Sequence, residues 1–311
     1  AVLASAASPV AGAFLALVFL ARALTLWAAA RSPDLGGSGR RPSAATRPWA
    51  GPLALTLAAL APIVVLAVAF PEGGHEPFAP SSFWPALGGV LAIALLIPRG
   101  PLSERGHRTV RIGALLYALA LIGSFAIKTP VGGNAARLGP ELAPALVTGI
   151  LWDRRRLALL LLSPVLLYWQ INTPIGDLSL ISGQPSANAS YYAPLLAELR
   201  TLRHDRPTIV EVPLTATHAE AAYLAGHDGI KLARGWERQL DTRYAALFYE
   251  PHLNAAAYQA WLGENRVSYV ALPDASLDYA GKAEGALVAR GLPYLHEVWR
   301  AQHWRLFQVI V

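Results

Sequence analysis

The chain contains no cysteine and no methionine among its 311 residues, and only 15% of its residues are charged. The absence of cysteine excludes disulfide bonds and thiolate metal sites. Soluble domains carry about 25% charged residues, so the low charge indicates that much of the chain lies in lipid. The mean hydropathy of +0.37 agrees with this interpretation. Because the chain begins with Ala1 and lacks the basic region of a signal peptide, we expect it to be the C-terminal part of a longer protein.

The excess of positive charge is confined to the first half of the chain. Residues 1–172 hold 14 Lys and Arg against 6 Asp and Glu, whereas residues 173–311 hold 12 against 14. The formal net charge of +6 therefore comes from the apolar half. This distribution is typical of membrane topology, and it argues against a nucleic-acid-binding surface.

Six apolar segments in the first half predict an α-helical polytopic membrane domain of about six spans over residues 1–171. A spanning helix needs about 20 apolar residues; the first two segments reach that length and the other four are shorter. The segments are Pro9–Ala30, Ala50–Phe70, Phe83–Ile97, Ile112–Ile127, Glu141–Trp152 and Leu157–Trp169.

The loops between these segments alternate in charge. Only two basic residues, Lys128 and Arg137, lie in the second and fourth loops. The first, third and fifth loops hold Arg31, Arg40, Arg41, Arg47, Arg99, Arg105, Arg108, Arg111, Arg154, Arg155 and Arg156. Because cytoplasmic loops are enriched in Lys and Arg, we predict a multi-pass plasma-membrane protein with its odd loops in the cytoplasm. Everything after Trp169 is then extracytoplasmic.

The second half has the composition of a soluble domain. Residues 172–190 are rich in turn formers and predict a linker. Over residues 191–311, helix and strand patterns alternate, which predicts a small extracytoplasmic α/β domain. The expected strands are Thr208–Val212, Val267–Leu272 and Trp304–Val311, and the expected helices begin near Tyr191, His218, Asn254 and Tyr279.

The densest cluster of charge and aromatic residues is Lys231–Glu250. It includes Arg234, Trp236, Glu237, Arg238 and Asp241. If the stretch is helical, Arg234 can meet Glu237 or Arg238, and Arg238 can meet Asp241. Arginine suits fork-like binding of phosphate or carboxylate, so the cluster is a candidate site for an anionic lipid headgroup or a glycan. The alternative is a self-contained ion-pair network that joins parts of the domain.

A second candidate is Arg137, in the predicted outer loop Lys128–Glu141. This loop is rich in turn formers, including Gly132, Gly133 and Asn134. Arg137 is a rare positive charge on the predicted outer face. It either contacts a phosphate at the level of the headgroups or pairs with Glu141 in a tight connector.

Motifs of catalysis are missing from the sequence. It contains no Walker motif, no H-E-x-x-H and no G-x-S-x-G, and no cofactor is evident. Asp274 and Asp278 follow a predicted strand and are compatible with a divalent metal ion. Capping of the next helix by Asp278 is the alternative interpretation.

Three runs of sequence carry a resemblance: HAEAAYLAGHDGIKLARGWERQLDTRYAALFY, YQAWLGENRVSYVALPDASLDYA and YLHEVWRAQHWRLFQV. Together with the loop GGNAARLG, they resemble the C-terminal part of uncharacterised multi-spanning actinobacterial membrane proteins. The plan of many spans followed by an extracytoplasmic α/β domain resembles that of GT-C glycosyltransferases.

This resemblance implies a transferase that uses a polyprenyl-phosphate sugar as donor and a cell-envelope glycan or lipid as acceptor. In that superfamily the catalytic carboxylate lies in an early outer loop, within a motif such as D-x-D or E-x-D. The chain contains neither pattern, so we expect the catalytic loop to lie on a missing N-terminal portion. In this interpretation Arg137, Arg234 and Arg238 contact the phosphate or the acceptor, and Glu237 and Asp241 orient them.

Two other functions remain open. A transporter is disfavoured because no internal repeat is apparent and the predicted spans hold few polar residues. A non-catalytic membrane scaffold, whose outer domain binds a glycan or a partner through aromatics such as Trp236, is the second alternative.

Overall fold

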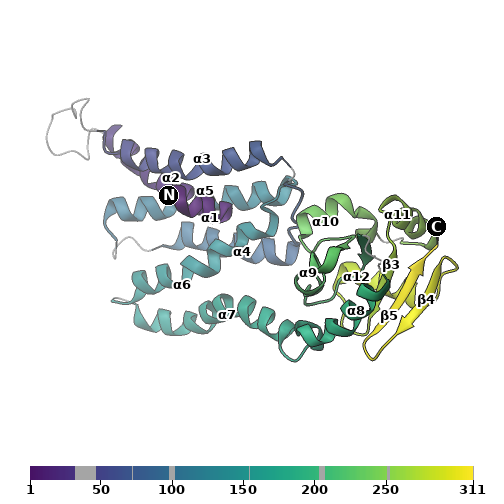
Figure 1. The fold of residues 1–311 in the computed structure, drawn as a ribbon. Coiled ribbons are helices and arrows are strands. Elements are labelled where there is room, and N and C mark those ends of the chain that lie inside the picture. The colour runs from purple at the N-terminus through teal and green to yellow at the C-terminus, as the bar shows by residue number, and fades with distance from the viewer. Residues whose placement is uncertain are drawn as a thin grey trace. The chain divides into compact units, whose positions relative to one another are not determined.

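A computed structural model describes residues 1–31, 47–71, 73–97, 102–153, 155–202, 207–250 and 253–310 (Figure 1). The chain divides into two compact units, Ala1–Asn172 and Thr173–Val311. We call them the helical unit and the α/β unit. The overall prediction of a largely helical chain with a small C-terminal sheet is confirmed. Several basic residues of the predicted loops, such as Arg40, Arg99 and Arg154, lie outside the described residues.

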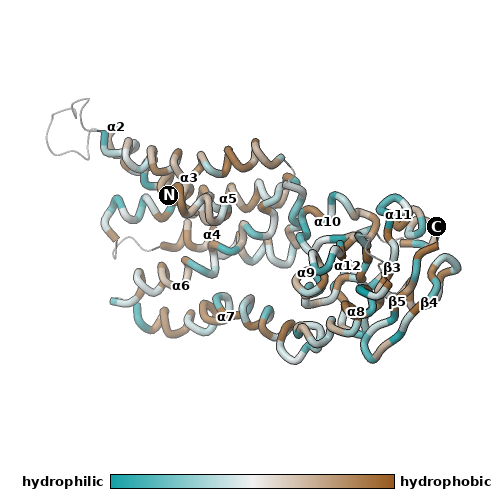
Figure 2. Tube along the Cα trace, in the orientation of Figure 1, coloured by the Kyte–Doolittle hydropathy of each residue, from teal (hydrophilic) through white to brown (hydrophobic). Residues whose placement is uncertain are grey.

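The helical unit is built from apolar helices joined by short connections. Hydrophobic residues run along most of their length (Figure 2). The helices are α1 (Val2–Ala7), α2 (Pro9–Arg31), α3 (Ala50–Ala69), α4 (Pro80–Leu96), α5 (Glu104–Ala126), the 3₁₀ helix η2 (Gly132–Arg137), α6 (Leu138–Leu151) and α7 (Arg156–Ile181). The part of α7 from Thr173 onward belongs to the α/β unit.

Three of the described helices, α2, α3 and α5, are long and apolar enough to cross a membrane. The number rises to four if the two parts of α7, Arg156–Asn172 and Pro174–Ile181, form one span with a 43° bend. The predicted count of six is not confirmed. Helices α4 and α6 have 17 and 14 residues, whereas a spanning helix requires about 20.

Small residues bring the helices of this unit close together. The buried residues of α2 are Gly12, Ala16, Ala21, Ala23 and Thr25. Larger side chains such as Leu57, Val65 and Val68 of α3 point outward and are exposed. Helices in membranes pack through small residues in this way, while large apolar side chains face the lipid.

Basic residues at the start of α5 differ from their prediction as loop residues. Arg105, Arg108 and Arg111 all lie within α5. Arg111 donates from Nε to the carbonyl oxygen of Ala94 at 3.0 Å, so it satisfies a carbonyl at the C-terminal end of α4. A positive charge at this end also interacts favourably with the helix dipole.

The segment before α6 is fixed by a second loop of the helical unit. The amide of Glu76 donates to the carbonyl of Thr129 at 3.0 Å, and the amide of Gly133 donates to that of Pro77 at 3.3 Å. Gly132 has a φ of +40°, and a Cβ there would lie 1.9 Å from the carbonyl oxygen of Glu76. Only glycine fits this position, in agreement with the turn predicted from the sequence.

The α/β unit contains one five-stranded mixed sheet with the strand order β2-β1-β3-β5-β4. Strand β1 pairs in parallel with β2 and β3, whereas β5 pairs antiparallel with β3 and β4. The strands are β1 (Thr208–Glu211), β2 (Ile230–Leu232), β3 (Tyr269–Pro273), β4 (Leu295–Arg300) and β5 (Trp304–Val309). The helices are α8 (Ala189–Leu202), α9 (Glu220–Tyr223), α10 (Arg238–Tyr244), α11 (Ala255–Glu264) and α12 (Tyr279–Ala289), with the 3₁₀ helices η3 (Pro185–Ala187), η4 (His227–Gly229) and η5 (Ala246–Tyr249).

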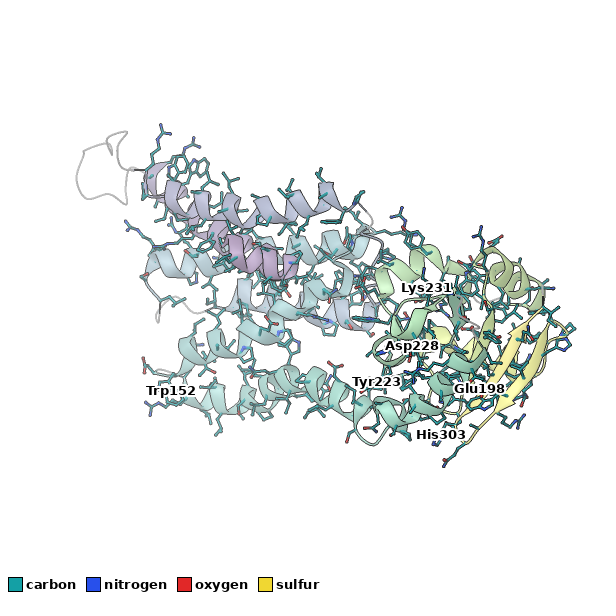
Figure 3. All side chains as sticks on the ribbon, in the orientation of Figure 1. Trp152, Glu198, Tyr223, Asp228, Lys231 and His303 are labelled. Atoms are coloured by element: carbon teal, nitrogen blue, oxygen red, sulfur yellow. The ribbon has the colours of Figure 1, made fainter. Side chains whose placement is uncertain are left out.

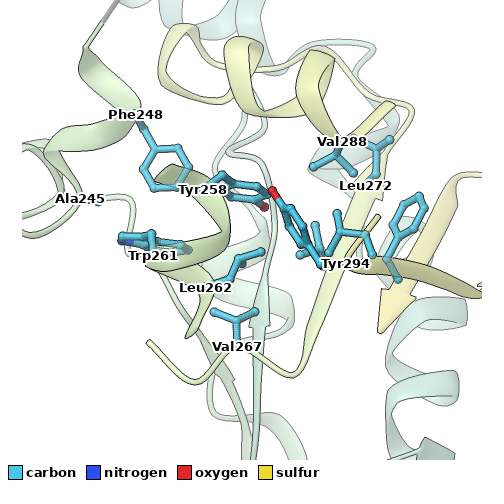
Figure 4. Packing of buried hydrophobic residues seen from close by; sticks show 12 residues of the cluster. Ala245, Phe248, Tyr258, Trp261, Leu262, Val267, Leu272, Val288 and Tyr294 are labelled. Atoms are coloured by element: carbon cyan, nitrogen blue, oxygen red, sulfur yellow. The ribbon is translucent and has the colours of Figure 1, made fainter. Parts of the chain in front are cut away.

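Both faces of the sheet are covered, because successive residues of its strands point to opposite sides. Val270 and Phe307 pack on the side of α11 and α12, in the cluster shown in Figure 4. Ala271 and Leu306 pack on the other side, against α8 and the residues around α9. The unit therefore has three layers, with helices on each face of one sheet.

The strands predicted at Thr208, Val267 and Trp304 are confirmed. The helices predicted near Tyr191, His218, Asn254 and Tyr279 are confirmed as well. Two differences concern other segments. Strands β2 and β4 are not among the expected strands, and α7 continues to Ile181, through the first half of the predicted linker 172–190. Apolar residues such as Ile175 and Leu178 continue the helix into the linker, although the segment also holds Pro174 and Gly176.

Candidate functional site

The stretch Lys231–Glu250 does not form the single helix on which its predicted contacts depend. It begins in β2, bends, and then forms the short helices α10 and η5. Arg234 lies in the bend before α10, so it has no helical spacing to Glu237 or Arg238. The contacts of these side chains therefore follow from the tertiary fold.

Arg234 is the centre of a buried ion-pair cluster. Its Nε and Nη2 atoms donate to the two carboxylate oxygens of Asp241, at 3.1 and 2.8 Å. Its Nη1 atom donates to Oε2 of Glu284 at 3.1 Å, and its guanidinium lies 3.7 Å from the ring centre of Phe248. Arg234 and Asp241 are only 4% and 5% exposed. This arrangement favours a structural clasp over direct contact with a ligand.

Two glutamates lie beneath this clasp, and both are fully buried. Glu284 on α12 accepts hydrogen bonds from Arg234 and from the hydroxyl of Tyr258, the latter at 2.8 Å. Glu211, the last residue of β1, lies 3.7 Å from Arg234 Nη1, and neither of its oxygens accepts a hydrogen bond from a described donor. Burial, together with the negative charge of Glu284, raises the pKa of Glu211 well above its usual value. Burial also raises the pKa of Glu284, although Arg234 opposes this.

Neither glutamate is among the site residues predicted from the sequence. Glu211 lies in the run TIVEV, which was predicted as a buried strand. An acid is almost never fully buried without a partner, so its position in that strand was a usable signal. Nothing in the sequence pattern connects it with Glu284, which follows 73 residues later.

Arg238 forms the half-buried edge of the same network. It donates from Nη1 to the hydroxyl of Tyr249 and from Nη2 to Oδ2 of Asp278, both at 2.9 Å. The hydroxyl of Tyr249 donates in turn to Asp241 at 2.6 Å, so Arg238 reaches Asp241 through a tyrosine. The guanidinium also lies 4.4 Å from the ring centre of Tyr279.

Asp278 caps α12, as the sequence predicted, because its Oδ1 accepts from the amide of Ala280 at 2.9 Å. Burial alone raises the pKa of Asp278, but the nearby His218 and the hydrogen bonds from Ala280 and Arg238 outweigh it and lower this pKa to about 2. His218 has a φ of +52°, and its Nε2 lies 3.7 Å from Oδ2 of Asp278.

The remaining predicted site residues are exposed. Trp236 is 54% exposed, and Glu237 and Arg137 are exposed as well. Trp236 and Glu237 lie in the bend before α10, whereas Arg137 ends η2 in the helical unit. The structure therefore brings Arg234, Arg238 and Asp241 into one network, and Trp236 and Glu237 lie outside it.

The described residues hold no group of three His, Asp or Glu side chains that could bind a metal ion. Asp274 and Asp278 have separate partners. Asp274 accepts from the hydroxyl of Tyr191 at 2.8 Å, and its Oδ2 lies 2.9 Å from Nδ1 of His303. His303 is labelled in Figure 3.

A second candidate site is an apolar pocket of about 270 Å³ in the helical unit, partly open to the surface, which we call the cavity. Helices α2, α4, α5, α6 and α7 line it, mostly through Ala, Gly, Val and Leu side chains. Trp169 of α7 lies over Gly139, where an added Cβ would be 2.7 Å from the indole. The hydroxyl of Tyr117 donates to the carbonyl of Ala135 at 2.7 Å and accepts from the amide of Gly139 at 3.2 Å.

Arg137 stands next to this cavity in sequence. Leu138 and Gly139, the residues that follow it, both line the cavity wall. An exposed cation therefore precedes the first turn of α6, whose inner face is apolar as far as Leu146. Arg137 could be identified from the sequence, but the cavity could not, because it is formed by the packing of five helices.

Comparison with protein-family models, with curated protein sequences and with solved structures finds no significant match to this chain.

Proposed function

We propose that this chain is part of an integral-membrane glycosyltransferase of the GT-C type, and that it binds the lipid-phosphate sugar donor through the helical unit. The observation that carries the proposal is the apolar cavity beside Arg137. Its lining suits the hydrocarbon chain of a polyprenyl phosphate, because a pocket lined by apolar side chains can bury the apolar surface of a ligand.

Arg137 supplies the charge that such a donor requires. The guanidinium group is suited to phosphate oxygens, and an exposed position lets it reach a headgroup while the chain enters the cavity. Arg234 is buried and paired, so it has no such part in the proposal. Arg238 retains a positioning role, because it is half-buried and joins Asp278 to the network behind it.

The proposed topology has the α/β unit and the loop before α6 on the outer face of the plasma membrane, with about six spans in the whole helical unit. The alternation of basic residues supports this placement. A cell-envelope glycan is the proposed acceptor, and exposed Trp236 offers a stacking surface for a sugar. The proposal assigns binding of the donor, and it assigns no residue of this chain to the chemical step.

Filling the cavity tests the proposal. Gly113 lines it, and a Cβ there would meet only the Cβ of Ala21, at 3.5 Å. Gly113→Leu should therefore fold but occupy the cavity. Gly123→Leu on the same helix is the matched control, since a Cβ at Gly123 has nothing within 4 Å.

The measurement is binding of a labelled polyprenyl phosphate to the full chain in nanodiscs. We expect the affinity for polyprenyl phosphate to fall at least tenfold in Gly113→Leu and to stay unchanged in Gly123→Leu. Arg137→Ala should weaken polyprenyl phosphate but leave the uncharged polyprenol unaffected. Equal binding by all variants would refute the donor site and favour the non-catalytic scaffold. Unchanged sugar transfer by Arg137→Ala and Arg238→Ala in a stably folded full-length protein would refute the proposed roles of these residues in a glycosyltransferase.

Membrane placement has a separate test. The chain has no cysteine, so single cysteines introduced at Arg137 or Trp236 can be labelled without background. Reaction with a membrane-impermeant maleimide in intact cells is expected at both positions. Protection of both would reverse the proposed topology.

A further inference from the structure

We propose that the α/β unit contains a proton-dependent latch, in which one proton shared by Glu211 and Glu284 holds the segment 233–249 on the sheet, and loss of that proton releases the segment.

Glu211 and Glu284 have too few hydrogen-bond donors around them for two ionised carboxylates. Both oxygens of Glu284 are already occupied, by Tyr258 and by Arg234. The Nε and Nη2 atoms of Arg234 both donate to Asp241. Glu211 is fully buried, and neither of its oxygens has a hydrogen-bond partner among the described residues. Oε1 of Glu211 and Oε2 of Glu284 lie 3.7 and 3.1 Å from the same atom, Nη1 of Arg234. Burial of a carboxylate without a donor costs far less in its neutral form, so this arrangement favours a proton on the pair.

The balance of charges around Arg234 also favours one retained proton. The titratable groups that face the pair are Arg234 after β2, Asp241 on α10 and Tyr258 on α11. With one proton on the pair, two negative charges face the single positive charge of Arg234. Without it there are three, all buried, and an uncompensated buried charge strongly destabilises the folded state. The raised pKa of Glu211 agrees with retention of the proton under conditions where an ordinary glutamate is ionised.

The segment 233–249 is the part of the site that moves. Glu211 and Glu284 belong to a central strand and to a helix of the three-layer core. The segment 233–249 contains only the 7-residue α10 and the 4-residue η5, and it carries Arg234 and Asp241. Ala245 and Phe248 pack this segment on the core, but such short elements still open at a lower free energy than central strands and longer helices do. Release of the segment opens the site to water, which solvates the ionised pair without unfolding of the sheet.

The test is hydrogen exchange of the full chain in nanodiscs between pH 5 and pH 9, corrected for intrinsic exchange rates. In the wild type, opening of segment 233–249 should rise by up to tenfold per pH unit until the pair is ionised. Glu211→Gln should remove this dependence, because its amide can donate to Glu284 at any pH. Glu284→Gln should do the same, and it covers the case in which the first variant does not fold.

Glu297→Gln is the matched control, since Glu297 lies on β4 and pairs with Arg300 and Arg305 outside the network. It should keep the wild-type pH dependence. Infrared spectroscopy should also show a protonated carboxyl band in the wild type that Glu211→Gln lacks. A wild-type slope in folded Glu211→Gln, or a wild-type protein without pH dependence and without that band, would overturn the proposal.

Discussion

Arg234 holds both carboxylate oxygens of Asp241 through two parallel hydrogen bonds, at 3.1 and 2.8 Å, and both side chains are buried. The pair joins the bend after β2 to α10, seven residues later. It is the geometry in which arginine binds a carboxylate most strongly, and here the carboxylate belongs to the protein itself.

Replacing Arg234 by Ala should destabilise the α/β unit by about 3–5 kcal/mol, because Asp241 and Glu284 would remain as unpaired buried charges. Thermal unfolding of the purified protein checks this. Arg243→Ala, at an exposed arginine on α10, is the control and should change stability little. A ligand-binding role for Arg234 would instead predict a stable variant with weakened binding.

Asp278 should make the α/β unit sensitive to acid. Its folded pKa of about 2 lies below the reference value of 3.8, so its stabilisation is present above pH 3.8 and is lost as the pH falls through 2. Because the group is half-buried, we expect a contribution of about 1–2 kcal/mol. Asp278→Asn should lower stability by this amount at pH 7 and converge with the wild type near pH 2. A constant difference across the acid titration would contradict this assignment.

Gly132→Ala should destabilise the helical unit by more than about 1 kcal/mol, since the residue has a positive φ and its Cβ would collide with the carbonyl of Glu76. The readout is the unfolding temperature in detergent. Gly149→Ala on α6 is the control, because a Cβ there meets nothing within 4 Å. Equal unfolding temperatures would show that the loop relaxes at no cost.

Tyr117→Phe removes the hydroxyl that links Ala135 to Gly139 at the start of α6. Loss of these two hydrogen bonds should cost about 1–3 kcal/mol, since a buried amide and carbonyl lose their partner. If the cavity is the donor site, binding of polyprenyl phosphate should weaken together with stability. Tyr168→Phe, at an exposed tyrosine of α7, is the control and should change neither property.

The elements of the α/β unit could be predicted where periodicity and length agreed. Strand β3, in VSYVAL, is a run of apolar residues bounded by Pro273, and α12 begins at the capping residue Asp278. Strand β2 was not predicted because its three residues are too few to show the alternation of apolar and polar residues that marks a strand. In the helical unit the apolar segments were located correctly, but the number that cross the membrane depends on lengths that composition does not fix.

The network around Arg234 could be predicted only in its residue types. The sequence identified Arg234, Arg238 and Asp241 as a cluster, and it offered a structural clasp as one interpretation. Helical spacing predicted contacts among these residues, whereas the partners of Arg234 in the structure include Glu284, 50 residues away. Such pairing depends on the order of strands in the sheet, which one sequence does not reveal.

The position of β5 has a consequence for synthesis of the protein. Although β5 is the last strand in the chain, it lies between β3 and β4 in the sheet. A nascent chain that has not yet reached Trp304 therefore leaves one edge of β3 without a partner strand, and β4 has no strand to pair with. Open strand edges invite pairing with other chains, so a ribosome that pauses before this point leaves the unit at its most vulnerable to aggregation.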